Sequence, residues 1–143
     1  MGWTHYWRRA AELPTTEFEA AVADCREILE ASGISLRGGQ DSDAPWLTGD
    51  EIVFNGAEGA GCEPFVFGRV QQARPGRDVV RGYCKTEHMP YDLVVQCCLV
   101  VLKHHLGDAV QITSDSGDEG WKGARRLCEE CLGYGSSFAL DET

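Results

Sequence analysis

Residues 90–107, PYDLVVQCCLVVLKHHLG, form the stretch of sequence that decides the fold. Between positions 93 and 102 the one polar residue is Gln96. Proline suits the first position of a helix, glycine suits the position after its last turn, and basic residues suit its negative C-terminal end. A helix that is apolar on nearly every face must be surrounded by other elements. The stretch therefore predicts a central, buried helix over about residues 90–106.

Shorter patterns lie on both sides of this helix. Alternating or short apolar runs between turn residues predict strands at 2–8, 34–36, 51–55, 65–70, 79–84 and 110–113. Helical patterns predict two further helices, over about 16–32 and 118–132. The strands cluster in the middle of the chain and the helices come late. The sequence thus predicts an α+β fold, with a mixed or antiparallel sheet of about five to six strands covered by three helices.

The length and the charge narrow the class of protein. A chain of 143 residues suits one domain, so we expect residues 1–143 to form a single domain with 134–143 as a frayed tail. The net charge of −10, from 13 basic and 23 acidic residues, argues against binding to nucleic acid or to an anionic membrane. Basic residues still gather locally, at Arg8-Arg9, at Arg69, Arg74, Arg77 and Arg81, and at Lys122, Arg125 and Arg126.

The cysteines and the apolar runs indicate a compartment. The chain has seven cysteines, an odd number, and several of them fall on apolar helix faces. No apolar run approaches the roughly 20 residues that span a bilayer, and the opening MGWTHYW has no signal-peptide pattern. We therefore expect reduced thiols, a cytoplasmic location and no membrane partner.

The nine residues CKTEHMPYD, at 84–92, are the densest group of reactive side chains. They come directly before the buried helix, whose N-terminus offers free N–H groups to an anion. Lys85 and Thr86 suit a phosphate, whereas Asp92 competes for the same N–H groups and suits ribose hydroxyls. The alternative is that Thr86 and Asp92 cap the helix and Lys85 is solvated. The two interpretations are compatible and both stay open.

The aromatic opening GWTHYW also has two interpretations. Alternation places Trp3, His5 and Trp7 on one side of the predicted strand, and Thr4 and Tyr6 on the other. Such rings form part of a core, or they line a cavity in which they stack on a nucleobase.

Other reactive groups give weaker signals. Cys84 near a helix N-terminus could be a nucleophile, but no base can be assigned to it. The single CxxC pair, Cys128 and Cys131, is too few ligands for zinc, so we predict no metal and no cofactor. The turn at 114–116 holds Ser114 and Asp115, which with His104 or His105 are the residue types of a hydrolase triad. Because no GxSxG motif is present, we interpret this turn as a cap for the last helix.

Several motifs together resemble a family of small uncharacterised proteins from phages and bacteria. Its members share a G-[YW]-T-H-Y-W opening, an FNG, a C-K-T…P-Y-D, a K-H-H and an S-S-D-G. The corresponding stretches here are GWTHYW at 2–7, IVFNG at 52–56, CKTEHMPYD at 84–92, LKHHLGD at 102–108 and ITSD at 112–115, where TSDS replaces S-S-D-G. The family has no established activity. The resemblance implies that one constellation contains His5, Trp7, Asn55, Lys85, Thr86, Tyr91, Asp92, Lys103, His104 and Asp115.

The leading hypothesis is a protein that binds a small polar ligand such as a nucleotide signal. Trp3 or Trp7 would stack on the ligand, Lys85 and Thr86 would meet phosphate, and Asp92, Asn55 and His5 would meet sugar or base. If the chain is phage-encoded, sequestering a host immune signal in the host cytoplasm would make it a counter-defence protein. A homo-oligomer fits this hypothesis, because sites often form between subunits. Two alternatives stay open: a small hydrolase or nucleotide-cleaving enzyme that uses His5, His104 or Cys84, and an acidic protein that blocks a host protein.

Overall fold

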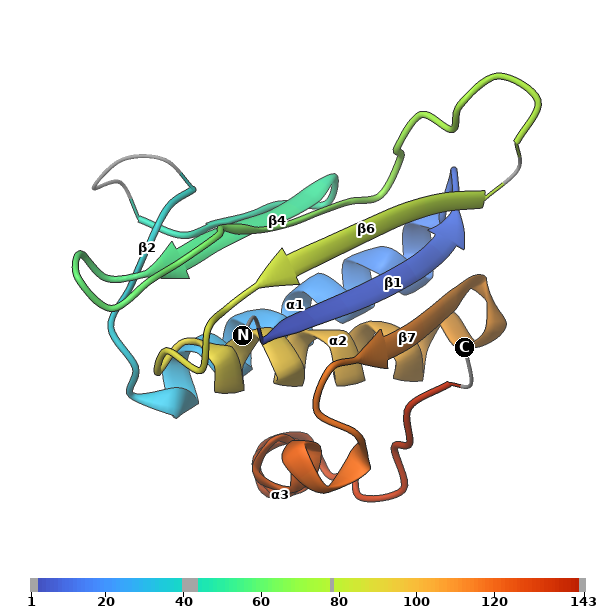
Figure 1. Cartoon of the computed structure of the whole chain (residues 1–143). Coiled ribbons are helices and arrows are strands. Elements are labelled where there is room, and N and C mark those ends of the chain that lie inside the picture. Colours follow the sequence, from blue (N-terminus) through green and yellow to red (C-terminus); the bar gives the residue numbers. More distant parts are fainter. Residues whose placement is uncertain (1–2, 40–43, 78, 142–143) are drawn as a thin grey trace.

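Helix α2 (Asp92–Leu106) is the centre of the fold, as the sequence predicts. Ten of its 15 residues are buried, Gln96 among them. It packs between α1 (Thr15–Ser32) and α3 (Lys122–Leu132), and strand β7 (Val110–Ser114) lies against it. This computed structural model describes residues 3–39, 44–77 and 79–141. Figure 1 shows α1 and α2 behind the strands and α3 at the edge of this helical layer.

Strand β1 (Thr4–Ala10) is the middle strand of a three-stranded antiparallel sheet. It pairs with β6 (Val79–Lys85) on one side and with β7 on the other. His5, Trp7 and Arg9 are buried on the helix side, whereas Tyr6 and Arg8 are exposed on the opposite side. No helix covers this opposite side in Figure 1. The sheet is therefore packed on one face and open on the other.

A second antiparallel sheet is built around β4 (Glu51–Gly56). Its other strands are β2 (Leu36–Arg37), β3 (Trp46–Leu47) and β5 (Phe65–Gly68), each of which pairs with β4. The α+β class is confirmed, but the described residues form two sheets with seven strands rather than one with five or six. The two-residue strand β3 was missed because two residues are too few to form a pattern. The predicted third helix begins at Lys122, after a short 3-10 turn over Asp118–Trp121.

Arg9 joins the two sheets. Its guanidinium group donates to the carbonyl oxygens of Gly68 and Arg69, and it lies 4.7 Å from the centre of the Phe67 ring. Burial lowers the pKa of Arg9 to about 10. Because burying a cation is costly without full hydrogen bonding, these carbonyl partners explain how β1 can carry arginine in the core.

The C-terminal segment is held in place, where the sequence analysis expected residues 134–143 to fray. The Phe138 ring stacks on Trp121, with 5.1 Å between the ring centres. Asp141 accepts a hydrogen bond from the backbone N–H of Ile112 at 2.8 Å and pairs with Lys103 at 3.2 Å. Residues up to 141 therefore close the free edge of β7 by side-chain contacts that a polar, Gly-rich sequence does not reveal.

Two further observations concern the compartment. All seven cysteines are free thiols, and those on the facing sides of α1, α2 and α3 are buried. Within residues 3–39, 44–77 and 79–141, no helix is long and apolar enough to cross a bilayer.

Candidate functional site

The His5 ring is at the centre of a group of four polar side chains from distant parts of the chain. The His5 ring is fully buried; its Nδ1 lies 2.7 Å from Ser114 Oγ and its Nε2 lies 2.6 Å from Asp92 Oδ1. The Thr86 hydroxyl donates to the same oxygen of Asp92. We call these four residues the His5 network. It ties β1, β7 and the first turn of α2 together, and it brings His5, Thr86 and Asp92 into direct contact.

A tight turn between β6 and α2 brings Asp92 to this network. The backbone N–H groups of Thr86 and Glu87 both donate to the carbonyl oxygen of Trp3, at 3.0 and 3.3 Å. Glu87 and His88 follow with φ angles of 53° and 61°, a left-handed conformation that side chains rarely adopt. The His88 ring lies against the Trp3 ring, with 3.6 Å between ring centres and an angle of 33° between the two planes. The predicted ligand residue Trp3 is thus fixed beside the turn.

Asp115 closes the ladder between β1 and β7 next to the network. Its carboxylate accepts the N–H of Thr4 at 3.0 Å, and its own N–H donates to the Thr4 carbonyl at 3.0 Å. The turn after it is held by Ser114, whose hydroxyl oxygen accepts the N–H of Ser116 at 3.2 Å. The turn thus presents Ser114 to His5, and not to His104 or His105 as the sequence analysis considered.

Three further residues lie around the same turn but make their contacts outside the His5 network: Lys85, Tyr91 and Cys84. Lys85 pairs with Glu87 at 3.2 Å, and this contact raises its pKa. The buried Tyr91 hydroxyl donates to the Glu63 carbonyl at 2.6 Å, and burial raises the pKa of that phenol. Burial also raises the pKa of the Cys84 thiol well above its ordinary value. The Cys84 side chain is fully buried and a neutral thiol is a poor nucleophile, so the structure does not favour Cys84 in that role.

Asn55 and Trp7 do not join the His5 network. The Asn55 side chain donates to the Cys62 carbonyl at 3.0 Å and accepts the N–H groups of Gly56 and Cys62, so it closes the loop at 56–62. The Trp7 indole is buried against Phe65 and Phe67. Both residues are part of the framework that holds the two sheets.

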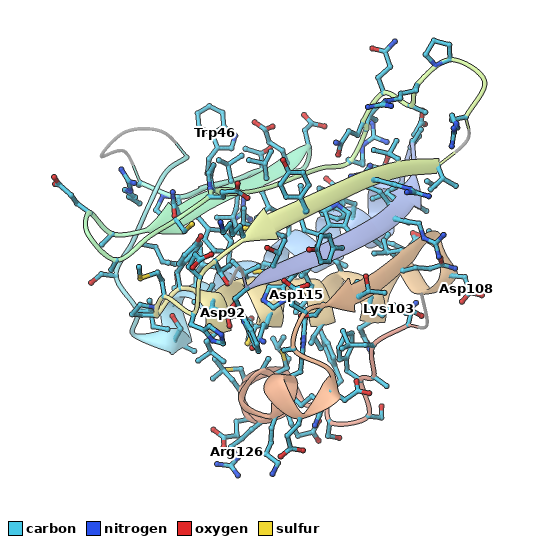
Figure 2. The ribbon with its side chains drawn as sticks, in the orientation of Figure 1. Trp46, Asp92, Lys103, Asp108, Asp115 and Arg126 are labelled. Atoms are coloured by element: carbon cyan, nitrogen blue, oxygen red, sulfur yellow. The ribbon has the colours of Figure 1, made fainter. Side chains whose placement is uncertain are left out.

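Lys103 and His104 lie at the other end of α2. Eleven residues of helix separate Lys103 from Asp92, about 16 Å at 1.5 Å per residue. Figure 2 shows the two residues toward opposite ends of the helix. Lys103 donates to the Val110 carbonyl at 2.8 Å, and His104 stacks on Tyr134 with 3.6 Å between ring centres. Burial lowers the pKa of His104. The structure therefore divides the predicted constellation among several places.

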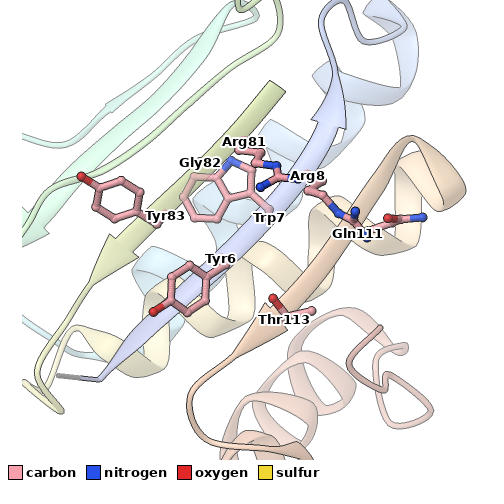
Figure 3. A pocket seen from close by; sticks show the side chains of 8 residues that line it. All are labelled: Tyr6, Trp7, Arg8, Arg81, Gly82, Tyr83, Gln111 and Thr113. Atoms are coloured by element: carbon pink, nitrogen blue, oxygen red, sulfur yellow. The ribbon is translucent and has the colours of Figure 1, made fainter. Parts of the chain in front are cut away.

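A different group of residues lines a hollow on the open face of the first sheet. The register places Tyr6 opposite Tyr83, and Arg8 opposite Arg81, across β1 and β6. The hollow measures about 370 Å³, and its lining is completed by Trp7, Gly82, Gln111 and Thr113 (Figure 3). We call it the open-face site. Tyr6 and Tyr83 are 42% and 64% exposed, so their rings are available for contact.

A second hollow continues from the first at Arg81. It measures about 480 Å³ and is lined by Arg74 and Arg77 together with residues 71–73 and 79–81. The sequence analysis named Arg8, Arg74, Arg77 and Arg81 as local basic patches and placed Tyr6 on the side opposite His5. It did not place Tyr6 beside these arginines, because neither segment alone indicates that β1 pairs with β6.

The side chains do not suggest a metal centre. In the described part of the chain, no three His, Cys, Asp or Glu residues are grouped so that they could hold an ion. Comparison with known proteins adds no relative: no family model, no curated protein and no solved structure matches this chain. The resemblance to phage and bacterial proteins therefore stays a prediction.

Proposed function

We propose that this protein binds a small phosphorylated ligand that carries an aromatic ring, such as a nucleotide, in the open-face site. One observation supports the proposal most strongly: two exposed tyrosine rings lie beside two arginines on the uncovered face of an otherwise acidic protein. Tyrosine rings stack on nucleobases, and guanidinium groups form paired hydrogen bonds with phosphate. The hollow of about 370 Å³ is at the small end of ligand sites, which suits one nucleotide.

The charges of the protein favour a small ligand on the open sheet face over a nucleic-acid polymer or a second copy of the chain. A nucleic-acid polymer would carry many phosphates past a protein with a net charge of −10. A second copy packed face to face about a two-fold axis would bring Arg8 and Arg81 of the two copies together, and like charges oppose such an interface. A ligand with one or a few phosphates is attracted to the arginines without either cost.

This proposal keeps the predicted ligand class and moves the site. The predicted contacts of Trp3, Lys85, Thr86 and Asp92 are replaced by Tyr6, Arg8, Arg81 and Tyr83. Sequestration of a host signalling nucleotide by a phage protein is the use that the family resemblance suggests.

Calorimetric titration with a panel of nucleotides tests the proposal. The panel contains nucleoside mono-, di- and triphosphates and cyclic mono- and dinucleotides. We expect at least one to bind, with an affinity that falls as salt is raised, because an exposed ion pair is screened. Loss of a charge-assisted hydrogen bond is worth about 1.5–3 kcal/mol, so Arg81→Gln should weaken binding roughly 10- to 100-fold. Tyr6→Ala should cost a similar factor through lost stacking, about 1–3 kcal/mol.

Arg126→Gln is the matched control. It removes the same charge from α3, away from the sheet (Figure 2). It should bind the nucleotide as the unchanged protein does. If no nucleotide in the panel produces heat, or if Arg126→Gln weakens binding as much as Arg81→Gln, the proposal fails.

A further inference from the structure

We propose that Ser114, His5 and Asp92 form a hydrolytic site, in which Ser114 is the nucleophile, His5 is the general base and Asp92 positions His5, for the cleavage of a small uncharged ester. This activity is separate from ligand binding on the open face. Ser114 and His5 lie directly opposite each other on β7 and β1, and Asp92 comes from the first turn of α2. Three rigid elements therefore supply the three groups.

The hydrogen bonds of the His5 network fix the direction of proton transfer. A carboxylate can only accept, so the 2.6 Å contact with Asp92 places a proton on Nε2 of His5. In the neutral imidazole, Nδ1 is then an acceptor, and the Ser114 hydroxyl at 2.7 Å donates to it. The Ser116 N–H donates to the same hydroxyl oxygen, and the Ser116 Oγ lies 3.1 Å from it. The ring nitrogen, at 2.7 Å, is the nearer acceptor for the Ser114 proton.

Asp92 is itself held by Thr86, whose hydroxyl donates to the oxygen that also meets His5. The order of nucleophile, imidazole and carboxylate is the one that activates serine in hydrolases. Here the serine faces Nδ1 and the carboxylate faces Nε2. Either ring nitrogen can accept the proton when the other is held by a carboxylate, so this order supports the same chemistry.

A second observation points to a missing oxygen ligand beside the imidazole. Three buried indole N–H groups, those of Trp3, Trp7 and Trp121, have no hydrogen-bond partner among the described residues, and the rings of Trp3 and Trp121 lie beside His5. The Trp121 ring is fully buried, and its centre lies 4.9 Å from that of His5; the Trp3 ring lies 6.5 Å away. Buried donors are almost always paired, so each exception calls for an explanation. A substrate carbonyl oxygen, which gains negative charge during attack, would satisfy such donors.

The surroundings of Ser114 offer a way in. Ser114 is half-buried, and so is Trp3, whose ring lies between His88 and Gly120. The turn that carries His88 has two consecutive residues with positive φ. Strained backbone of this kind gathers at functional sites and persists only where the surroundings hold it. We place the entry of a substrate on this side of the network, beside Trp3 and His88.

Charge selects the substrate class. The charged group in the network is the Asp92 carboxylate, and Asp115 is next to Ser114 in the chain. Lys85, the nearest basic residue in this turn, is paired with Glu87. An anionic phosphate ester would be repelled, whereas a neutral carboxylic ester would not. The oxygen of Ser114 attacks the carbonyl carbon, and its proton passes to Nδ1 of His5. The departing alkoxide takes that proton, and water then releases the carboxylic acid from the acyl-Ser114 intermediate.

Two probes test this inference on the full-length protein. A fluorophosphonate should form an adduct on Ser114, located by peptide mass spectrometry, and p-nitrophenyl acetate should release p-nitrophenol. Ser114→Ala should abolish the adduct, and the matched variant Ser136→Ala, at an exposed position outside the His5 network, should keep it. Asp92→Asn should slow labelling at least 100-fold and alter its dependence on pH, because asparagine no longer holds the proton on Nε2. Thermal unfolding confirms that each variant is folded.

The outcomes separate this inference from the proposed function. Labelling of Ser114 in the Arg81→Gln variant at the unchanged rate supports two independent sites. If the folded protein forms no adduct, or if Ser114→Ala reacts as fast as the unchanged protein, Ser114 is not a nucleophile. If Asp92→Asn reacts at the unchanged rate with the same pH profile, the network is only a structural contact, whatever the result with nucleotides.

Discussion

Replacing Gly82 by alanine should destabilise the protein through one specific contact. A methyl group at Gly82 would lie 2.3 Å from Nε1 of Trp7 and 2.9 Å from Cζ2, closer than atoms can approach. Trp7 cannot move freely, because Phe65 and Phe67 pack against its ring. Overpacking of this kind costs about 1–3 kcal/mol. A chain of this length loses about 3 °C in melting temperature per kcal/mol, so we expect a loss of roughly 3–10 °C.

Circular dichroism during heating measures this change, and two further variants make the result specific. In Gly82→Ala/Trp7→Phe the smaller ring should relieve the contact, so the double variant should lose less than the sum of the single effects. Gly123→Ala is the control, because its methyl group would meet Leu93 at an ordinary 3.6 Å on a helix that favours alanine. A Gly82→Ala protein that melts within about 1 °C of the unchanged protein would refute this description of the packing between β1 and β6.

Three other changes have expected outcomes. Iodoacetamide at pH 8 should modify half-buried Cys62 before Cys84, because burial raises the pKa of the Cys84 thiol. Peptide mass spectrometry measures the order of modification. Faster reaction at Cys84 would contradict the burial of this thiol in the structure. In a urea titration, Asp141→Ala should lower the free energy of unfolding by about 1–2 kcal/mol, because a backbone N–H and a lysine lose their acceptor. The control Asp108→Ala, at an exposed position, should have little effect on the same free energy. Arg9→Met should lower the free energy of unfolding by about 2–4 kcal/mol in the same titration, since buried carbonyl groups lose their donors. A loss below about 0.5 kcal/mol would show that the two sheets stay joined without the Arg9 hydrogen bonds.

The elements whose patterns are local were the ones that the sequence could predict. The buried helix depends on residues 93–102 alone, and its predicted range differs from Asp92–Leu106 by two residues at one end. The division of the strands into two sheets could not be predicted in this way. Strand β6 pairs with β1, some 75 positions away, and no local pattern specifies that register. The folded C-terminal segment was missed for the same reason, since Asp141 acts on β7 from a distance.

The contacts of the candidate site were also predictable only in part. His5, Thr86 and Asp92 were predicted together, and the structure joins them by direct hydrogen bonds. Ser114 was considered only beside His104 or His105 and was interpreted as part of a cap, because antiparallel pairing alone sets it opposite His5. Tyr6 was recognised as facing away from His5 and was not considered further. Alternation in the sequence shows which residues share one face of a strand. Only the pairing of the strands shows which residues of neighbouring strands lie together on that face.

Mapping of chemical shifts by nuclear magnetic resonance tests the central claim most directly. Titration of the labelled protein with the nucleotide that binds best in calorimetry should shift the backbone and side-chain signals of Tyr6, Arg8, Arg81 and Tyr83. The signals of His5 should move little, because its ring is on the buried face of the same strand. Shifts confined to His5 and its neighbours, with the four open-face residues unchanged, would contradict the assignment of the ligand to the open face of the sheet.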